Sequence, residues 1–230
     1  MHAIREAFVA IIGVLVISLS LGCGTPTATT ATKDTPSSQN QNMTTDGLIK
    51  VESAGPGDLY LRKDHGIGGY DAIAVAPSFV NYKRTSARLE PDDEELYLVT
   101  LEQTLIDIAE AADVPIANAA GECVIKVGAG FVNVDLARSE SANVLGRMTL
   151  VIEYQDSVSG QSLLRSVSNQ MIKREADGTS REQQIADSFD RMTQEVDVLS
   201  ALVAATSVPS PPRAGCEGAL VKARDRAVPQ

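Results

Sequence analysis

The chain has 230 residues, a formal net charge of −10 and a pI near 4.7, with no tryptophan and only 4% aromatic residues. Its negative charge argues against nucleic acid and against anionic lipid headgroups as partners, because both repel an acidic surface. The few aromatic side chains also leave little material for the stacking surfaces that sugar-binding proteins use.

The first 23 residues have the pattern of a cleaved export signal. A charged start at Arg5 precedes an apolar run from Ala7 to Leu21. A membrane-spanning helix needs roughly 20 apolar residues, more than this run supplies. Small Gly22 beside Cys23 suits a peptidase that cuts between them. We therefore expect residues 1–22 to be removed as a signal peptide.

The segment Leu19-Ser20-Leu21-Gly22-Cys23 resembles the lipobox of bacterial lipoproteins. The resemblance implies that Cys23 receives a thioether-linked diacylglycerol and becomes an acylated N-terminus. Several acyl chains, at about 0.8 kcal/mol per buried methylene, make a durable membrane anchor. Gly24 follows, where an aspartate would favour the inner membrane, so we expect the outer membrane, facing the periplasm. The alternative is an ordinary secretory signal with a coincidental cysteine.

The segment after the signal is rich in Thr, Ser, Asn, Gln and Pro up to Gly47. It cannot bury enough apolar surface to offset the entropy of ordering. We therefore predict that residues 23–47 are the lipidated cysteine and a disordered tether. A single α/β domain is expected over residues 48–205, followed by an irregular C-terminal tail over residues 206–230.

Two short strands are predicted first, over Leu48–Ser53 and Leu59–Arg62, where apolar and polar residues alternate. The run Asp71–Tyr82 predicts a strand with a local break, because Pro77 lacks the N–H that a central ladder needs. The glycine-rich loop Asp64–Gly69 precedes a strand and does not join a strand to a helix, so a phosphate cradle is not expected there.

A long helix is predicted to begin at Pro91. Its first turn carries the carboxylates of Asp92, Asp93, Glu94 and Glu95 near the positive end of the helix dipole. Apolar residues then recur at steps of three and four until Val114-Pro115, where the proline ends the helix. We interpret the carboxylates as solvated, because the spaced acidic loop of a calcium site is missing.

Three longer strands are predicted next. Glu122–Leu136 changes its side-chain parity beside Gly128-Ala129-Gly130, which predicts a bulge there. Arg147–Gln155 and Leu163–Ile172 predict a hairpin, and Gly160 in its turn can supply a positive φ.

A second helix is predicted to start with a capping box, either Ser180 with Gln183 or Thr179 with Glu182, and to continue through Leu199. The element order predicts an α/β (α+β) two-layer sandwich: a mixed sheet of about four to six strands with two main helices on one face. The strands that flank the first helix should be parallel.

Cys123 and Cys216 are the cysteines that remain once Cys23 is lipidated. Two cysteines in an oxidising periplasm usually pair, so we predict a Cys123–Cys216 disulfide, with two free thiols as the alternative. His65 is the only histidine outside the signal. No metal site and no cofactor are expected from so small a ligand set. No hydrolase motif accompanies His65, and no catalytic residue is predicted.

Four segments carry a family resemblance: Leu59-Tyr60-Leu61-Arg62-Lys63, Gly69-Tyr70-Asp71-Ala72-Ile73-Ala74-Val75, Val132-Asn133-Val134-Asp135 and Tyr154-Gln155-Asp156-Ser157-Val158-Ser159-Gly160-Gln161. They resemble a bacterial lipoprotein family known as domain of unknown function 3313. The resemblance covers roughly Gly47 to Leu202. Because that family has no assigned activity, it implies the domain boundaries and the lipoprotein anchor without naming a reaction.

We therefore expect a membrane-anchored, periplasm-facing bacterial lipoprotein that is not an enzyme. Its domain would be a noncatalytic protein-interaction or envelope-assembly module with an envelope protein as partner. The alternative is a carboxylate-dependent envelope enzyme or a small-ligand carrier. A concave pocket with two carboxylates about 5–10 Å apart would favour the enzyme. An exposed apolar patch would favour the interaction module.

Overall fold

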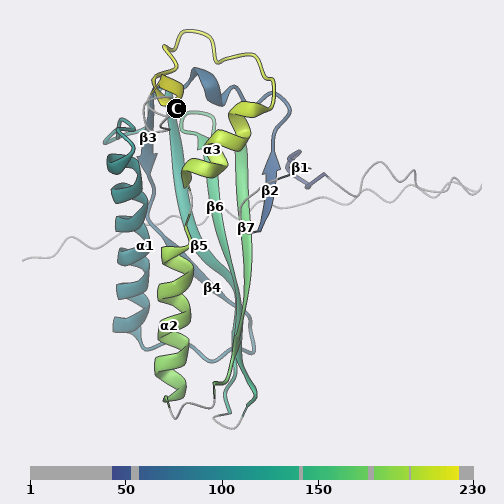
Figure 1. Ribbon diagram of the computed structural model, residues 1–230, viewed down its shortest axis with the longest axis vertical. Coiled ribbons are helices and arrows are strands. Elements are labelled where there is room, and N and C mark those ends of the chain that lie inside the picture. The colour runs from purple at the N-terminus through teal and green to yellow at the C-terminus, as the bar shows by residue number, and fades with distance from the viewer. Residues whose placement is uncertain (1–42, 53–56, 140–141, 176–178, 197, 223–230) are drawn as a thin grey trace, which may run out of the picture. The chain divides into compact units, whose positions relative to one another are not determined.

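The domain is built on a mixed seven-stranded sheet whose one face is covered by helices (Figure 1). The computed structural model describes residues 43–52, 57–139, 142–175, 179–196 and 198–222, all within the unit Gln39–Gln230. In these residues the elements are β1 (Ile49–Val51), β2 (Asp58–Leu61), β3 (Ala72–Val75), β4 (Phe79–Tyr82), α1 (Pro91–Ala111), β5 (Val124–Leu136), β6 (Val144–Asp156), β7 (Ser162–Lys173), α2 (Arg181–Gln194) and α3 (Val198–Ser207). The predicted two-layer α+β class is confirmed, and the described residues contain more strands and more helices than expected.

Strand β5 pairs with three strands and joins the antiparallel part of the sheet to the parallel part. The strand order is β1-β2-β7-β6-β5-β3, and β4 also pairs with β5. Both β3 and β4 run parallel to β5, so α1 is the crossover connection that the sequence predicted. The single strand predicted over Asp71–Tyr82 is therefore two strands, β3 and β4, which both pair with β5. Pro77 lies between them, where a residue without an N–H interrupts the ladder least.

The bulge in β5 lies later than predicted. Pairing with β6 is regular at Gly128-Ala129-Gly130, and the register shifts between Val132 and Asp135. Asn133 has φ 54°, a left-handed conformation that asparagine tolerates and that admits the extra residue. Gly130 has a different role, because a Cβ there would lie 2.7 Å from the ring of Phe79. Glycine at this position lets an aromatic ring lie flat on the strand.

The predicted hairpin between β6 and β7 is confirmed. The two strands pair antiparallel along their length, and Gly160 in the turn has φ 70°. On β6 the alternating residues that were expected to share one face are all buried: Met148, Leu150, Ile152 and Tyr154. This face of the sheet therefore meets the helices.

An aromatic trio joins α1 and α2 to the sheet. The ring of Phe189 on α2 stacks on Tyr97 of α1 with centroids 4.9 Å apart. The same ring meets Phe131 of β5 edge-on at 4.7 Å. Phe189 is 1% exposed, so this contact lies in the centre of the core. Figure 1 shows α1 and α2 side by side on the sheet.

Helix α2 begins as one of the two capping alternatives predicts. The Ser180 hydroxyl accepts a hydrogen bond from the Gln183 amide at 3.1 Å, so Ser180 is the N-cap. The prediction that this helix continues through Leu199 is wrong, because α2 ends at Gln194 and α3 begins at Val198. Both helices bury apolar residues in the same core. The spacing of apolar residues therefore continues from α2 into α3 although the helix is interrupted.

Candidate functional site

The segment after α3 folds back onto the loop that precedes β3. Cys216 in this segment forms a disulfide with Cys123, and the two Sγ atoms lie 2.02 Å apart. The Asp71 carboxylate accepts a hydrogen bond from the backbone N–H of Glu217 at 2.9 Å. We call residues Val208–Leu220 the C-terminal clasp. The structure thus brings the predicted cysteine pair together. Residues 208–218 form no helix or strand, but the disulfide and hydrogen bonds hold them against the domain.

Arg213 of the C-terminal clasp reaches a buried acidic group. Its Nη1 donates to Asp156 Oδ2 and to the Tyr70 hydroxyl, the latter at 3.0 Å. The Tyr70 hydroxyl in turn donates to Asp156 Oδ2 at 2.7 Å. The Asp156 side chain is only 2% exposed. The guanidinium also lies over the Tyr70 ring, 5.1 Å from its centroid, so charge and ring face attract each other.

This cluster is suited to holding the fold. Burial acts to raise the pKa of the Asp156 carboxyl, but hydrogen bonds from Ser159 and Tyr70 and the charge of Arg213 bring that pKa below its ordinary value. Burial and the bond to Asp156 raise the pKa of Tyr70 to about 12. A saturated carboxylate and a phenol that resists ionisation are poor general bases near neutral pH. We therefore assign the cluster a structural role.

His65 is also a contact of the C-terminal clasp. It is 3% exposed, and its Nδ1 accepts a hydrogen bond from the Ile67 amide at 3.1 Å. Its Nε2 lies 3.2 Å from the Val208 carbonyl oxygen, which places the proton on Nε2. Burial lowers the pKa of the imidazole. Both ring nitrogens form hydrogen bonds that suit the neutral imidazole. Neutral His65 therefore holds the C-terminal clasp.

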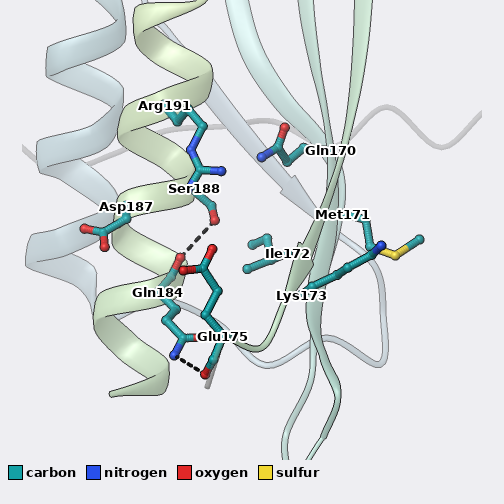
Figure 2. Close-up of a pocket in the computed structure, with 9 residues that line it drawn as sticks. All are labelled: Gln170, Met171, Ile172, Lys173, Glu175, Gln184, Asp187, Ser188 and Arg191. Carbon is teal, nitrogen blue, oxygen red and sulfur yellow. Dashed lines mark hydrogen bonds between the residues drawn. The ribbon is translucent and has the colours of Figure 1, made fainter. Parts of the chain in front are cut away.

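A pocket of about 350 Å³ lies between α2 and the end of β7 (Figure 2). Two carboxylates line it, those of Glu175 and Asp187. Figure 2 shows Asp187 pointing away from β7, and its Oδ1 accepts from Gln183 Nε2 at 2.7 Å. The two carboxylates do not face each other. This pocket therefore lacks the converging pair that a glycosidase-like reaction uses.

An open groove of about 460 Å³ lies between α1 and the segments that flank β4. We call it the α1 groove; its lining includes Ser78, Leu89, Pro91, Leu98, Val99 and Glu102. Val99 is 59% exposed, and Leu96, about one helical turn before it, is 60% exposed. The groove therefore combines apolar walls with exposed apolar side chains, and we take it as the candidate functional site.

The carboxylates predicted to be solvated lie at the start of α1, beside the α1 groove. Asp92, Asp93 and Glu95 are exposed. Glu94 is tied to the sheet, since its Oε2 accepts from the Tyr82 hydroxyl at 2.8 Å. Nothing in the sequence pattern indicated that one of the four would hold α1 to β4.

The other predicted site residues can be placed briefly. Cys23 lies outside the described residues, so its lipidation stays a prediction. Within the described ranges, ligand-type atoms of Asp71, Cys123 and Cys216 lie within 4.8 Å of one another. Both sulfur atoms belong to the disulfide, which leaves no thiolate for a metal. The described helices include none long and apolar enough to cross a bilayer.

Fold and site together define a disulfide-clasped α+β sandwich domain with an acidic, partly apolar groove. No family model matches the chain, and no curated protein matches it. The resemblance to domain of unknown function 3313 therefore stays a prediction.

Several solved structures show a weak likeness. The PelC dodecamer protein from Paraburkholderia phytofirmans is 12% identical over 66% of this chain and 98% of its own, with a TM-score of 0.32. Protein XCC0632 from Xanthomonas campestris, of family DUF330, is 10% identical over 61% of this chain and 84% of its own, with a TM-score of 0.36. A minor lipoprotein from Acinetobacter baumannii is 13% identical over 61% of this chain and 97% of its own, with a TM-score of 0.33. At these TM-scores the likenesses carry no argument about activity.

Proposed function

We propose that this chain is a membrane-anchored, periplasm-facing bacterial lipoprotein whose domain is a noncatalytic protein-interaction or envelope-assembly module. Acyl chains on Cys23 hold it in the outer membrane. The tether predicted over residues 23–47 is shorter, because Asp46 is ion-paired with Arg165 of β7, so we place the tether before Met43. An envelope protein is the partner.

The Cys123–Cys216 disulfide supports the proposed compartment. Disulfides persist in oxidising compartments such as the bacterial periplasm and are rare in the cytosol. The acidic chain also has little attraction for anionic headgroups, so the proposed anchor must supply the membrane affinity.

The observation that carries the interaction role is the exposed apolar surface of α1. Leu96 and Val99 lie one helical step apart and are more than half exposed. Single exposed apolar side chains are ordinary, but here Val99 lines an open groove with apolar walls and Leu96 lies one helical turn before it. A protein partner that covers this surface would remove all of it from water.

The proposed function is tested by crosslinking in intact cells, comparing the native chain with Cys23→Ala. We expect one dominant envelope protein from the native chain and its loss from the variant. An intact Cys123–Cys216 disulfide in both chains controls for folding. Recovery of no partner from well-folded native chain would contradict the interaction role.

The anchor has its own test. Cells fed an alkyne-tagged fatty acid should label the native chain and leave Cys23→Ala unlabelled. Cys123→Ala serves as a matched cysteine control and should keep its label. An unlabelled native chain would favour the ordinary secretory signal.

A further inference from the structure

Helix α1 carries charge of one sign. It has no lysine or arginine and seven carboxylates: Asp92, Asp93, Glu94, Glu95, Glu102, Asp107 and Glu110. The whole chain has a net charge of −10, so this helix is the main source of its negative field. Such a surface attracts basic partners and repels acidic ones.

The acidic helix borders apolar walls. Pro91, Leu98 and Val99 of α1 line the α1 groove together with Leu89, which precedes the helix. Glu94, Glu95 and Glu102 belong to the same lining, and among the described residues Arg88 is the one cation in it, so carboxylates outnumber positive charge beside the apolar walls. An occupant therefore needs an apolar side chain for the walls and positive charge beside it.

An unpartnered hydroxyl points to an occupant independently of charge. Ser78 lines the α1 groove, and its Oγ is buried without a hydrogen-bond partner among the described residues. A buried hydroxyl without a partner costs free energy, and most such groups in proteins are satisfied. Rotation of the Ser78 side chain toward the groove would let a polar group on an occupant satisfy it.

We propose that the α1 groove binds a basic segment of a partner protein that inserts an apolar side chain between Leu89 and Val99. Lysine or arginine residues beside that side chain face Glu95 and Glu102. This inference rests on the interaction role proposed above and adds the chemistry of the partner. A second copy of the chain does not fit, because two acidic α1 helices repel each other. Anionic headgroups are repelled for the same reason.

The proposal is tested with the purified full chain in detergent and a fluorescent eleven-residue peptide that carries two leucines between flanking lysines. Anisotropy is measured at physiological ionic strength, where long-range charge effects are screened within about 8 Å. We expect this peptide to bind. Versions with serine for leucine, or glutamate for lysine, should bind at least tenfold more weakly.

Two pairs of charge-reversal substitutions on α1 distinguish binding in the groove from general attraction to the negative charge of the helix. Glu95→Lys with Glu102→Lys changes the groove lining and should weaken peptide binding at least tenfold. Asp107→Lys with Glu110→Lys makes the same charge change outside that lining and should weaken it less than threefold. Ser78→Ala should also weaken binding. Equal losses from both pairs, or no binding of the leucine–lysine peptide, would overturn the proposal.

A photo-crosslinking amino acid distinguishes this inference from the interaction role itself. It is placed at Val99 in the groove or at Val158, which is 62% exposed in the β6–β7 turn. We expect the envelope partner to crosslink at Val99, through a peptide that contains lysine or arginine. A partner captured by the native chain that crosslinks at Val158 and not at Val99 would keep the interaction role and overturn the groove.

Discussion

Replacing Cys123 and Cys216 by alanine would show how much the disulfide contributes to stability. The bond joins residues 93 apart in sequence, for which the chain-entropy model gives about 4–5 kcal/mol at 25 °C. The folded state should persist, because the Asp71 carboxylate and the Arg213 ion pair still hold the C-terminal clasp. The loss therefore comes mainly from the unfolded chain, which gains freedom.

The assay is urea unfolding of the Cys23→Ala chain, followed by circular dichroism. We expect the double alanine variant to lose about 4–5 kcal/mol of unfolding free energy. Its m-value should rise, because an unfolded chain without the crosslink exposes more surface. Reduced Cys23→Ala chain should match the double variant. A loss below about 1 kcal/mol with an unchanged m-value would refute the reasoning.

Three further predictions use the same unfolding assay. Phe189→Ala removes the ring that joins both long helices to β5 and should cost about 3–5 kcal/mol, whereas a loss near zero would mean that the core refills the space. Ser180→Ala should cost about 1 kcal/mol through the lost N-cap, and Ser180→Asp should restore most of it; equal stability of the two variants would contradict the cap. The lowered pKa of Asp156 makes its contribution fully present above the ordinary carboxyl pKa, and that contribution is lost as pH falls through the folded-state pKa. Stability should therefore drop below about pH 4, and Asp156→Asn should flatten that drop; identical acid profiles would refute the assignment.

The sequence predicts the elements whose signals are local. Ser180 caps α2 through a residue three positions away, and Gly160 supplies the positive φ of the β6–β7 turn. The parallel pairing of β3 and β4 with β5 follows from a crossover helix and a handedness rule. The cap and the turn need only a short window of sequence, and the parallel pairing needs only the order of the elements, so pattern and propensity determine them.

The C-terminal clasp could not be predicted in the same way. Arg213 and Asp156 are 57 residues apart, and His65 and Val208 are 143 apart. No periodicity links such positions, and three prolines made the segment resemble an irregular tail. The bulge at Asn133 was missed because nearby glycines gave the stronger local signal, although one of them, Gly130, makes room for the Phe79 ring. The α1 groove depends on how the segments flanking β4 lie against α1, so its acidic residues were visible and its shape was not.

The C-terminal clasp has a consequence for the order in which the chain can finish folding. The Asp71 carboxylate accepts hydrogen bonds from backbone N–H groups 146 and 148 positions later. His65 forms a hydrogen bond with a carbonyl oxygen 143 positions later. Contacts of such separation require a large loop closure and form late. While residues 208–220 are still being synthesised, Asp156 has no Arg213 and Cys123 has no partner thiol. The domain can therefore complete its fold only once residues 208–220 are present, because they bury His65 and supply the cysteine that pairs with Cys123.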